Sequence, residues 1–167
     1  MPELPEIEIV KRSLNKMINK AKIIDIKIYN KNLRYKIPDR FSEILVGKKI
    51  LKISRRSKYL IFHFKKQLLL IHFGMSGKFL LLNNNDGKMF RTSFYYNLQI
   101  LQKHNHIYFK LNNNFFLIYN DVRRFGFFKL YDSKKLNEII FLKKLGLEPF
   151  SKKFNIKDFK KSVNKRK

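Results

Sequence analysis

The chain begins Met-Pro-Glu-Leu-Pro-Glu, which places a proline directly after the initiator methionine. Proline is small enough for that methionine to be removed, so Pro2 can carry a free secondary amine. An α-amine titrates near about pH 8, so part of it is unprotonated and nucleophilic at neutral pH, unlike an exposed lysine. Attack of this nitrogen on the C1′ carbon of a sugar gives an iminium ion, whose positive charge eases loss of the 3′-phosphate. The terminus therefore predicts covalent catalysis by Pro2.

Two acidic residues follow Pro2 at positions from which they can assist it. We expect Glu3 to protonate the opening sugar ring or the leaving base, and Glu6, one helical turn later, to hold the amine and its water network. The same residues also make an ordinary helix start, because Pro5 suits the first helical position and glutamates complement the helix dipole. Their position at the chain terminus favours the catalytic interpretation.

Two internal motifs can bring further groups to a site. In Arg-Arg-Ser-Lys-Tyr-Leu, residues 55–60, basic side chains lead into an apolar strand. A solvated surface is the ordinary interpretation, but at a strand edge Lys58 can hold its ammonium against a phosphate or a leaving base. In residues 71–77 two glycines bracket Met75, and an exposed turn would let Met75 push into a base stack. Met75 in the core and His72 as a structural histidine are the alternatives.

A third motif, Asp-Val-Arg-Arg-Phe-Gly at residues 121–126, combines two guanidinium groups, an aromatic ring and a glycine between two strands. Such a loop can fill a gap in a duplex. Arg123 can hydrogen-bond the orphaned partner base, Arg124 can clamp a phosphate, and Phe125 can stack in the vacancy. The motif predicts binding to nucleic acid.

The composition points to a polyanionic partner. There are 38 Lys and Arg against 12 Asp and Glu, a formal net charge of +26. AT-biased codons would also enrich lysine, but they explain the arginine pairs at 55–56 and 123–124 less well. Cysteine is absent, which excludes disulfides and thiolate zinc sites. His104 and His106 are spaced to share a strand face; without a third ligand nearby, phosphate contact or packing is favoured over a metal.

The hydrophobic pattern predicts one helix followed by many strands. The helix starts at Pro5, and its apolar positions are Ile7, Val10, Leu14, Met17 and Ile18. The expected strands are Ile23–Tyr29, Ile50–Ile53, Tyr59–Phe64, Leu68–Phe73, Phe79–Leu82, Ile107–Leu111, Phe115–Tyr119 and Phe127–Leu130. We therefore expect an α+β fold, in which the N-terminal helix precedes a mostly antiparallel β-sandwich or flattened barrel with flanking helices.

The remaining expectations concern the end of the chain and its location. Residues 134–144 are predicted to form a surface helix, and the basic stretch after Phe159 to lack order. Domain boundaries are expected at 1–150 for the catalytic domain and 151–167 for a basic tail. No secretory signal and no apolar run of membrane-spanning length is apparent, so a cytoplasmic location is expected.

Taken together, PELPEIE, RRSKYLIF, IHFGMSG, DVRRFG and LGLEPF occur in an order that resembles the N-terminal domain of formamidopyrimidine-DNA glycosylases, from Met1 to about Phe154. The resemblance implies excision of oxidised purines such as 8-oxoguanine and formamidopyrimidines from duplex DNA, then β- and δ-elimination, without a small-molecule cofactor. It implies that Pro2 is the Schiff-base nucleophile, Glu3 the proton donor, Glu6 a supporting acid and Lys58 the proton donor of β-elimination.

The resemblance also implies DNA contacts. Met75, Arg123 and Phe125 match an intercalating trio, His104 and Arg123 match DNA-contacting positions, and Lys167 matches another at the end of the chain. His72 and Arg124 join this set as DNA-binding candidates. The implied partner is damaged double-stranded DNA. The resemblance also implies that the protein is a monomer and that it associates with the nucleoid of a bacterial cell.

Several departures from the family pattern keep two alternatives open. The family continues into a helix–two-turn–helix segment and a four-cysteine zinc finger, which these residues do not include, and a separate chain that supplies them is one of the partners considered. Val122 replaces a usual proline and Asn105 a common aspartate, and the segment from Gly77 to His104 is long. The alternatives are a DNA-binding remnant without catalysis and a generic basic nucleic-acid module; the latter predicts no dependence on Pro2.

Overall fold

The computed structural model describes residues 2–92, 101–148, 151 and 154–164. Contacts divide the chain into two units, Met1–Leu136 and Asn137–Lys167. This division lies earlier than the boundary expected after residue 150. Within the described ranges, no helix is both long enough and apolar enough to cross a membrane.

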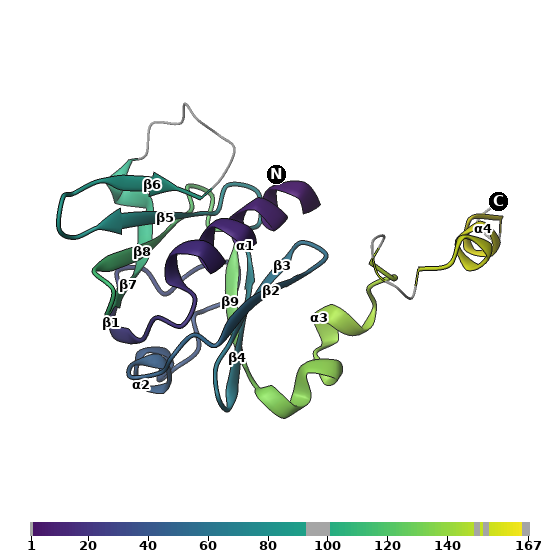
Figure 1. Cartoon of the computed structure of the whole chain (residues 1–167), viewed down its shortest axis with the longest axis horizontal. Coiled ribbons are helices and arrows are strands. Elements are labelled where there is room, and N and C mark those ends of the chain that lie inside the picture. The colour runs from purple at the N-terminus through teal and green to yellow at the C-terminus, as the bar shows by residue number, and fades with distance from the viewer. Residues whose placement is uncertain (1, 93–100, 149–150, 152–153, 165–167) are drawn as a thin grey trace. The chain divides into compact units, whose positions relative to one another are not determined.

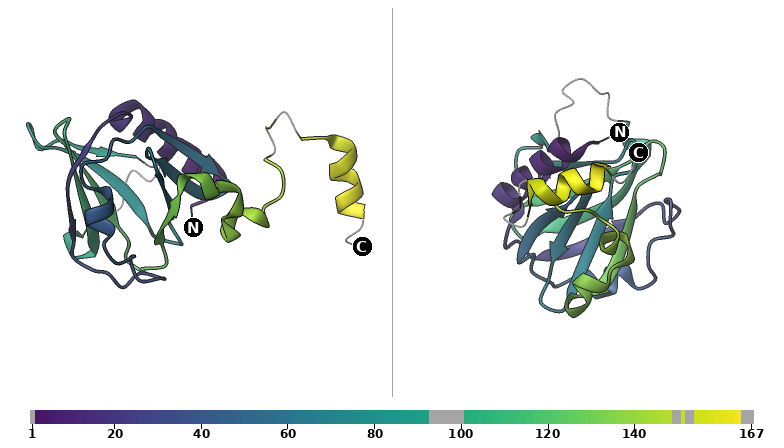
Figure 2. Two further views of the ribbon diagram at one scale, coloured as in Figure 1. Left: turned by 90° about the horizontal axis from the view of Figure 1, so that it is seen from below. Right: turned by 90° about the vertical axis from the view of Figure 1, so that its right-hand side faces the viewer.

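Helix α1, Leu4–Ile18, forms where the sequence predicts it. Glu3 is its N-cap, and Glu3 and Glu6 form a capping box in which each side chain accepts a main-chain N–H of the other residue. One face of the helix is buried, through Ile7, Val10, Leu14 and Ile18. This face packs α1 against strands β2, Lys52–Arg56, and β3, Tyr59–His63, as the views in Figures 1 and 2 show.

Two antiparallel sheets follow α1 (Figure 1). The five-stranded sheet has the order β1-β7-β8-β5-β6 and consists of Ile23–Ile28, Asn105–Leu111, Phe115–Asn120, Lys78–Asn83 and Met89–Arg91. The four-stranded sheet has the order β2-β3-β4-β9 and consists of Lys52–Arg56, Tyr59–His63, Gln67–His72 and Phe127–Asp132. The α+β expectation and the antiparallel pairing are thereby confirmed.

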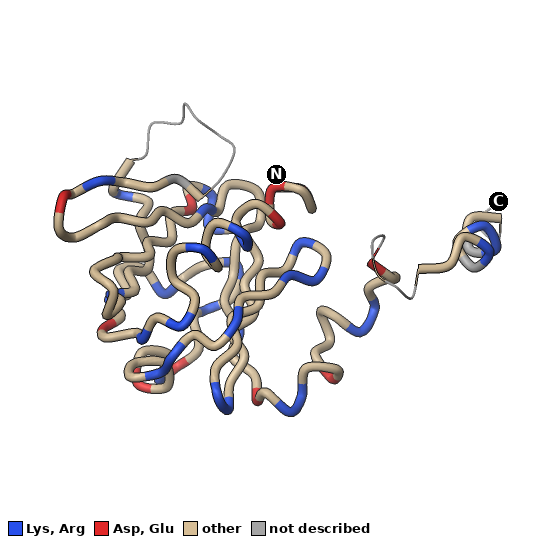
Figure 3. The backbone as a smooth tube through the Cα atoms, in the orientation of Figure 1, with Lys and Arg blue, Asp and Glu red and all other residues tan. Residues whose placement is uncertain are grey.

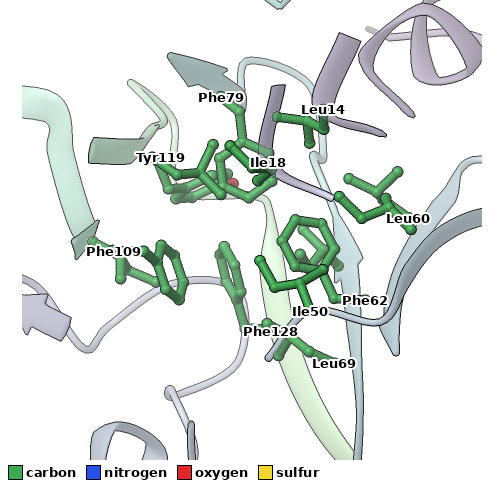
Figure 4. Close-up of a cluster of buried hydrophobic side chains, with 14 of the residues drawn as sticks. Leu14, Ile18, Ile50, Leu60, Phe62, Leu69, Phe79, Phe109, Tyr119 and Phe128 are labelled. Carbon is green, nitrogen blue, oxygen red and sulfur yellow. The ribbon is translucent and has the colours of Figure 1, made fainter. Parts of the chain in front are cut away.

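The core lies where aromatic rings of the two sheets meet. Phe128 of β9 contacts Tyr119 of β8 edge to face, with ring centroids 4.8 Å apart, and Phe62 of β3 contacts Phe79 of β5 at 6.1 Å. Residues of α1 complete this cluster. Figure 4 labels Leu14, Ile18, Ile50, Leu60, Phe62, Leu69, Phe79, Phe109, Tyr119 and Phe128.

Each of the eight expected strands has a counterpart in the structure, but one short strand and one short α-helix were not expected. Strand β6, Met89–Arg91, has three residues, and helix α2, Phe41–Leu45, has five. Neither is long enough to show a period in its sequence. Arg40, the N-cap of α2, has a φ of 58° in the left-handed region, which sequence periodicity also does not reveal.

The C-terminal unit corrects two expectations. In place of one helix over 134–144, a 3₁₀ helix at Ser133–Glu138 and helix α3 at Ile140–Lys143 are separated by Ile139, which is extended and buried. Of the stretch after Phe159 that was expected to lack order, residues 160–164 lie in helix α4, Ile156–Asn164, and residues 165–167 lie outside the described residues. Ile156, Phe159 and Val163 recur at helical spacing, so the segment has an apolar face in spite of its lysines.

Candidate active site and nucleic-acid interface

The structure brings Glu3 and Lys58 together. Lys58 Nζ lies 2.8 Å from Glu3 Oε2, although one residue caps α1 and the other follows β2. Lys58 reaches this place from a two-residue turn in which Ser57 has a φ of 52°, in the left-handed region. Pro2 directly precedes Glu3 and is half-buried. Two of the predicted catalytic residues, Glu3 and Lys58, therefore meet at the start of α1, and Pro2 is the chain neighbour of Glu3.

Glu6 also lies at this turn, but the structure shows it in a helix-capping role. Its carboxylate accepts the main-chain N–H of Glu3, which fixes the start of the helix directly after Pro2. The capping box thus orients Glu3 towards Lys58. A supporting catalytic role for Glu6 stays a prediction.

A buried ion pair holds α1 against β2, and sequence reasoning missed it. Arg55 Nε donates to Glu8 Oε2 at 3.0 Å, and Arg55 Nη1 donates to the Ser57 carbonyl at 2.9 Å. Only 11% of the Arg55 side chain is exposed. Lys11 Nζ and Arg12 Nε also pair with Glu8, at 2.6 and 3.0 Å. Glu8 therefore fixes the turn that carries Lys58 relative to the helix that carries Pro2.

The Glu8 carboxylate should make the fold sensitive to acid. Burial alone would raise its pKa, but hydrogen bonds from Lys11, Arg55 and Arg12 outweigh burial and lower the pKa from 4.5 to about 2. A lowered folded-state pKa stabilises the protein above pH 4.5, and this stability is lost as the pH falls towards 2. We expect the loss to be about 1–3 kcal/mol, allowing for solvent screening of the pair.

Urea unfolding at several pH values, with Glu8→Gln beside the unaltered chain, measures this contribution. Near neutral pH the Gln variant should be less stable, and the difference should shrink between pH 4.5 and 2. Glu43→Gln is the control, because the Arg40–Glu43 pair is exposed and contributes little. A Glu8→Gln difference that stays constant across this pH range would contradict the assignment.

A second cluster joins the two loops predicted to enter DNA. Asp121 is fully buried and accepts three hydrogen bonds. Ser76 Oγ donates to it at 2.5 Å, the Tyr119 hydroxyl at 3.0 Å and the Gly126 N–H at 2.9 Å. The Arg123 N–H in turn donates to Ser76 Oγ at 3.0 Å. Asp121 thus ties the Met75 turn to the loop that carries Arg123.

The same two loops touch through their backbones. Gly74 has a φ of +64°, and a Cβ at this position would lie 2.4 Å from the Phe125 carbonyl carbon. Met75 and Phe125 are each 43% exposed, so Met75 is not a core residue. The Arg123 guanidinium lies 4.7 Å from the centre of the Phe125 ring. Two exposed apolar side chains and one guanidinium therefore project from adjacent loops.

His72 has the packed environment that the structural alternative predicted. Its Nδ1 accepts the Gly74 N–H at 3.1 Å, and its ring stacks on Phe127 with centroids 5.5 Å apart. Burial, followed by the positive charges of Arg34 and Lys58, lowers the pKa of His72 below its usual 6.5. A neutral ring that accepts at Nδ1 carries its proton on Nε2. DNA binding by His72 stays a prediction.

His104 and His106 do not share a strand face as expected. His104 ends the 3₁₀ helix Gln102–His104, whereas His106 is buried in β7 with Nε2 2.7 Å from the Asp121 carbonyl oxygen. Among the residues that the structure describes, no three His, Cys, Asp or Glu side chains are grouped so that they could hold a metal ion. Arg124 is exposed, with a φ of 57°. Lys167 lies outside the described residues.

Lys and Arg positions are spread along much of the described backbone, including the β2–β3 turn (Figure 3). Acidic residues are few by comparison, and two of them, Glu3 and Glu8, are paired with Lys58 and Arg55. The net positive charge of the chain can therefore attract a polyanion.

Comparison with known proteins places this geometry in a family. The model of the formamidopyrimidine-DNA glycosylase N-terminal domain matches residues 1–128. The formamidopyrimidine-DNA glycosylase of Bartonella tribocorum is 42% identical over 99% of this chain and 57% of its own length. That of Rickettsia bellii is 37% identical over 99% of this chain and 56% of its own length. The chain spans just over half the length of these relatives.

A solved structure agrees with these matches. In a crystal structure of the complex between the Lactococcus lactis Fpg and an abasic site containing DNA, the protein is 33% identical, with a TM-score of 0.81. The match covers 98% of this chain and 57% of that one. Because the sequence match covers most of the residues and the fold agrees, the chain belongs to the formamidopyrimidine-DNA glycosylase N-terminal domain family.

Proposed function

We propose that this chain acts in base-excision repair, removing oxidised purines such as 8-oxoguanine and formamidopyrimidines from duplex DNA and cleaving abasic sites through a Pro2 Schiff base. The observation that carries the proposal is the 2.8 Å pair of Glu3 and Lys58 beside Pro2. Two groups able to exchange a proton stand next to an amine nucleophile, which is what covalent sugar chemistry requires. A relative of known structure binds abasic-site DNA, which supports the same substrate class.

The lyase reaction uses the groups at the first turn of α1. With Met1 removed, the Pro2 nitrogen adds to the C1′ aldehyde of the opened abasic sugar, and water leaves to give an iminium ion. A water molecule then takes a C2′ proton, and the electron pair of that C–H bond forms the C2′–C3′ double bond while the C3′–O bond breaks. The phosphate departs as an anion beside the Lys58 ammonium, and Glu3 passes a proton to the sugar oxygen as the ring opens.

Excision of an intact damaged base also needs the nucleotide to leave the stack. Met75 and Phe125 would enter the duplex while Arg123 bonds the orphaned partner base, offsetting an unstacking cost of a few kcal/mol. No small-molecule cofactor takes part in these steps. We place the chain in the bacterial cytoplasm as a monomer on double-stranded DNA.

Borohydride trapping tests the proposal. The purified chain, with methionine removal verified by intact mass, is mixed with duplex DNA bearing an abasic site and reduced. We expect a covalent adduct that maps to Pro2, and 3′-phosphate elimination in the unreduced reaction. Measurable DNA binding with neither adduct nor strand cleavage would favour the DNA-binding remnant without catalysis.

A further inference from the structure

An open groove lies beside the Arg123–Phe125 loop. Its second wall is formed by Asn32, Leu33 and Arg34, which have no role in the steps described above. The groove has a volume of about 650 Å³ and is lined by Asn32, Leu33, Arg34, Arg123, Arg124 and Phe125. This volume falls within the range of about 300–1,000 Å³ typical of ligand sites. The lining contains three guanidinium groups and no carboxylate, so an anion is the ligand that fits it.

The two walls are held at a fixed spacing by main-chain contacts. The Arg34 N–H donates to the Gly126 carbonyl at 3.2 Å, which joins the loop before Pro38 to the loop after Asp121. Leu33 is 9% exposed and anchors its wall in the core, and Tyr35 contacts Phe127 edge to face at 5.1 Å. The groove is therefore formed before any ligand arrives, which lowers the entropic cost of binding.

The Arg34 side chain is exposed and is held only loosely by its neighbour. Its guanidinium lies 5.9 Å from the centre of the Tyr35 ring, near the outer limit of a cation–π contact. Its positive charge reaches His72, whose pKa it lowers together with Lys58, after burial. Arg34 and Lys58 therefore both lie near enough to the His72 ring to act on its charge.

The second wall also shares its groove with the residues expected to meet the orphaned base. A phosphodiester next to that base lies on the strand facing the attacked nucleotide. Guanidinium groups match phosphate oxygens in geometry as well as charge. On these grounds, and resting on the proposed function, we propose that the groove holds the backbone of the DNA strand opposite the damaged nucleotide, and that Arg34 is a phosphate contact for that strand.

Equilibrium binding of Arg34→Ala to DNA carrying an uncleavable abasic analogue tests this proposal. We expect duplex affinity to fall about tenfold. The slope of log affinity against log salt should lose about 0.9, the value for one phosphate contact. Affinity for the isolated lesion strand should not change, because the opposite strand is then missing. Arg34→Gln, which keeps much of the side-chain length but not the charge, should behave in the same way.

Lys36→Ala is the matched control. It removes one positive charge from the same loop, but Lys36 does not line the groove and pairs with Asp39 at 3.7 Å. An Arg34→Ala effect no larger than that of Lys36→Ala, or an equal loss on the single strand and the duplex, would overturn the proposal. Binding to the analogue needs no chemistry, so failure of the Pro2 reaction would appear in the trapping experiment and leave this result intact.

Discussion

A chain whose Pro2 nitrogen is locked in an amide should give no trapped adduct with abasic DNA. An added residue that stays ahead of Pro2 after processing would achieve this, because an amide lone pair is delocalised and is not nucleophilic. We expect adduct formation and strand cleavage to fall by at least about 10³-fold, the scale seen when a nucleophile is removed. Pro2→Gly keeps a terminal amine but not a secondary one, and should retain part of the activity.

Pro5 provides the matched control, because it is a second proline in the first turn of the same helix. Pro5→Gly alters the helix start as Pro2→Gly alters the terminus, but it leaves the Pro2 amine intact. Its adduct yield should stay near that of the unaltered chain. An adduct that persists in the chain with a blocked Pro2 would identify another amine as the nucleophile, and peptide mapping would show whether it is Lys58.

Replacing Asp121 by alanine should lower the free energy of unfolding by about 3–5 kcal/mol. Asp121 is fully buried, and three donors from Ser76, Tyr119 and Gly126 would lose their acceptor together. Each buried donor left without a partner costs about 1–3 kcal/mol, and these sites are too close for the costs to add fully. Urea unfolding at neutral pH measures the change.

Asp132→Ala is the control for this variant. Asp132 is exposed and accepts one hydrogen bond, from the Lys134 N–H at 2.8 Å, so its loss should cost below about 1 kcal/mol. Asp121→Asn keeps one acceptor oxygen and should fall between the two. Equal stability of the Asp121→Ala and Asp132→Ala chains would show that the buried network does not hold the loops together.

Much of the fold could be predicted because its elements carry strong local patterns. Helix α1 has a buried face at helical spacing, and eight strands are apolar runs bounded by turn residues. Strand β6 could not be predicted because it is short and is defined by its pairing with β5. The break at Ile139 was missed because tertiary burial, and not helix propensity, decides its extended conformation.

The residues of the candidate site also fall into two groups, those that the sequence could predict and those that it could not. Motifs at the terminus and in the loops indicated Pro2, Lys58 and Met75 by residue type alone. The partners that position them could not be found, since Glu8 meets Arg55 only after α1 packs on β2. The contact of Asp121 with Ser76 likewise could not be predicted, because Ser76 lies in another loop, far from Asp121 in the sequence.

The backbone contact between Gly74 and Phe125 has a mechanical consequence. Since the backbones of these loops touch, the loop that carries Met75 cannot move towards the loop that carries Phe125 without displacing it. The conformational entropy that two mobile loops would lose on entering a duplex has already been lost during folding. In the proposed function the two side chains would therefore enter the duplex together, and the depth of entry into a base step would be governed by how readily that step opens.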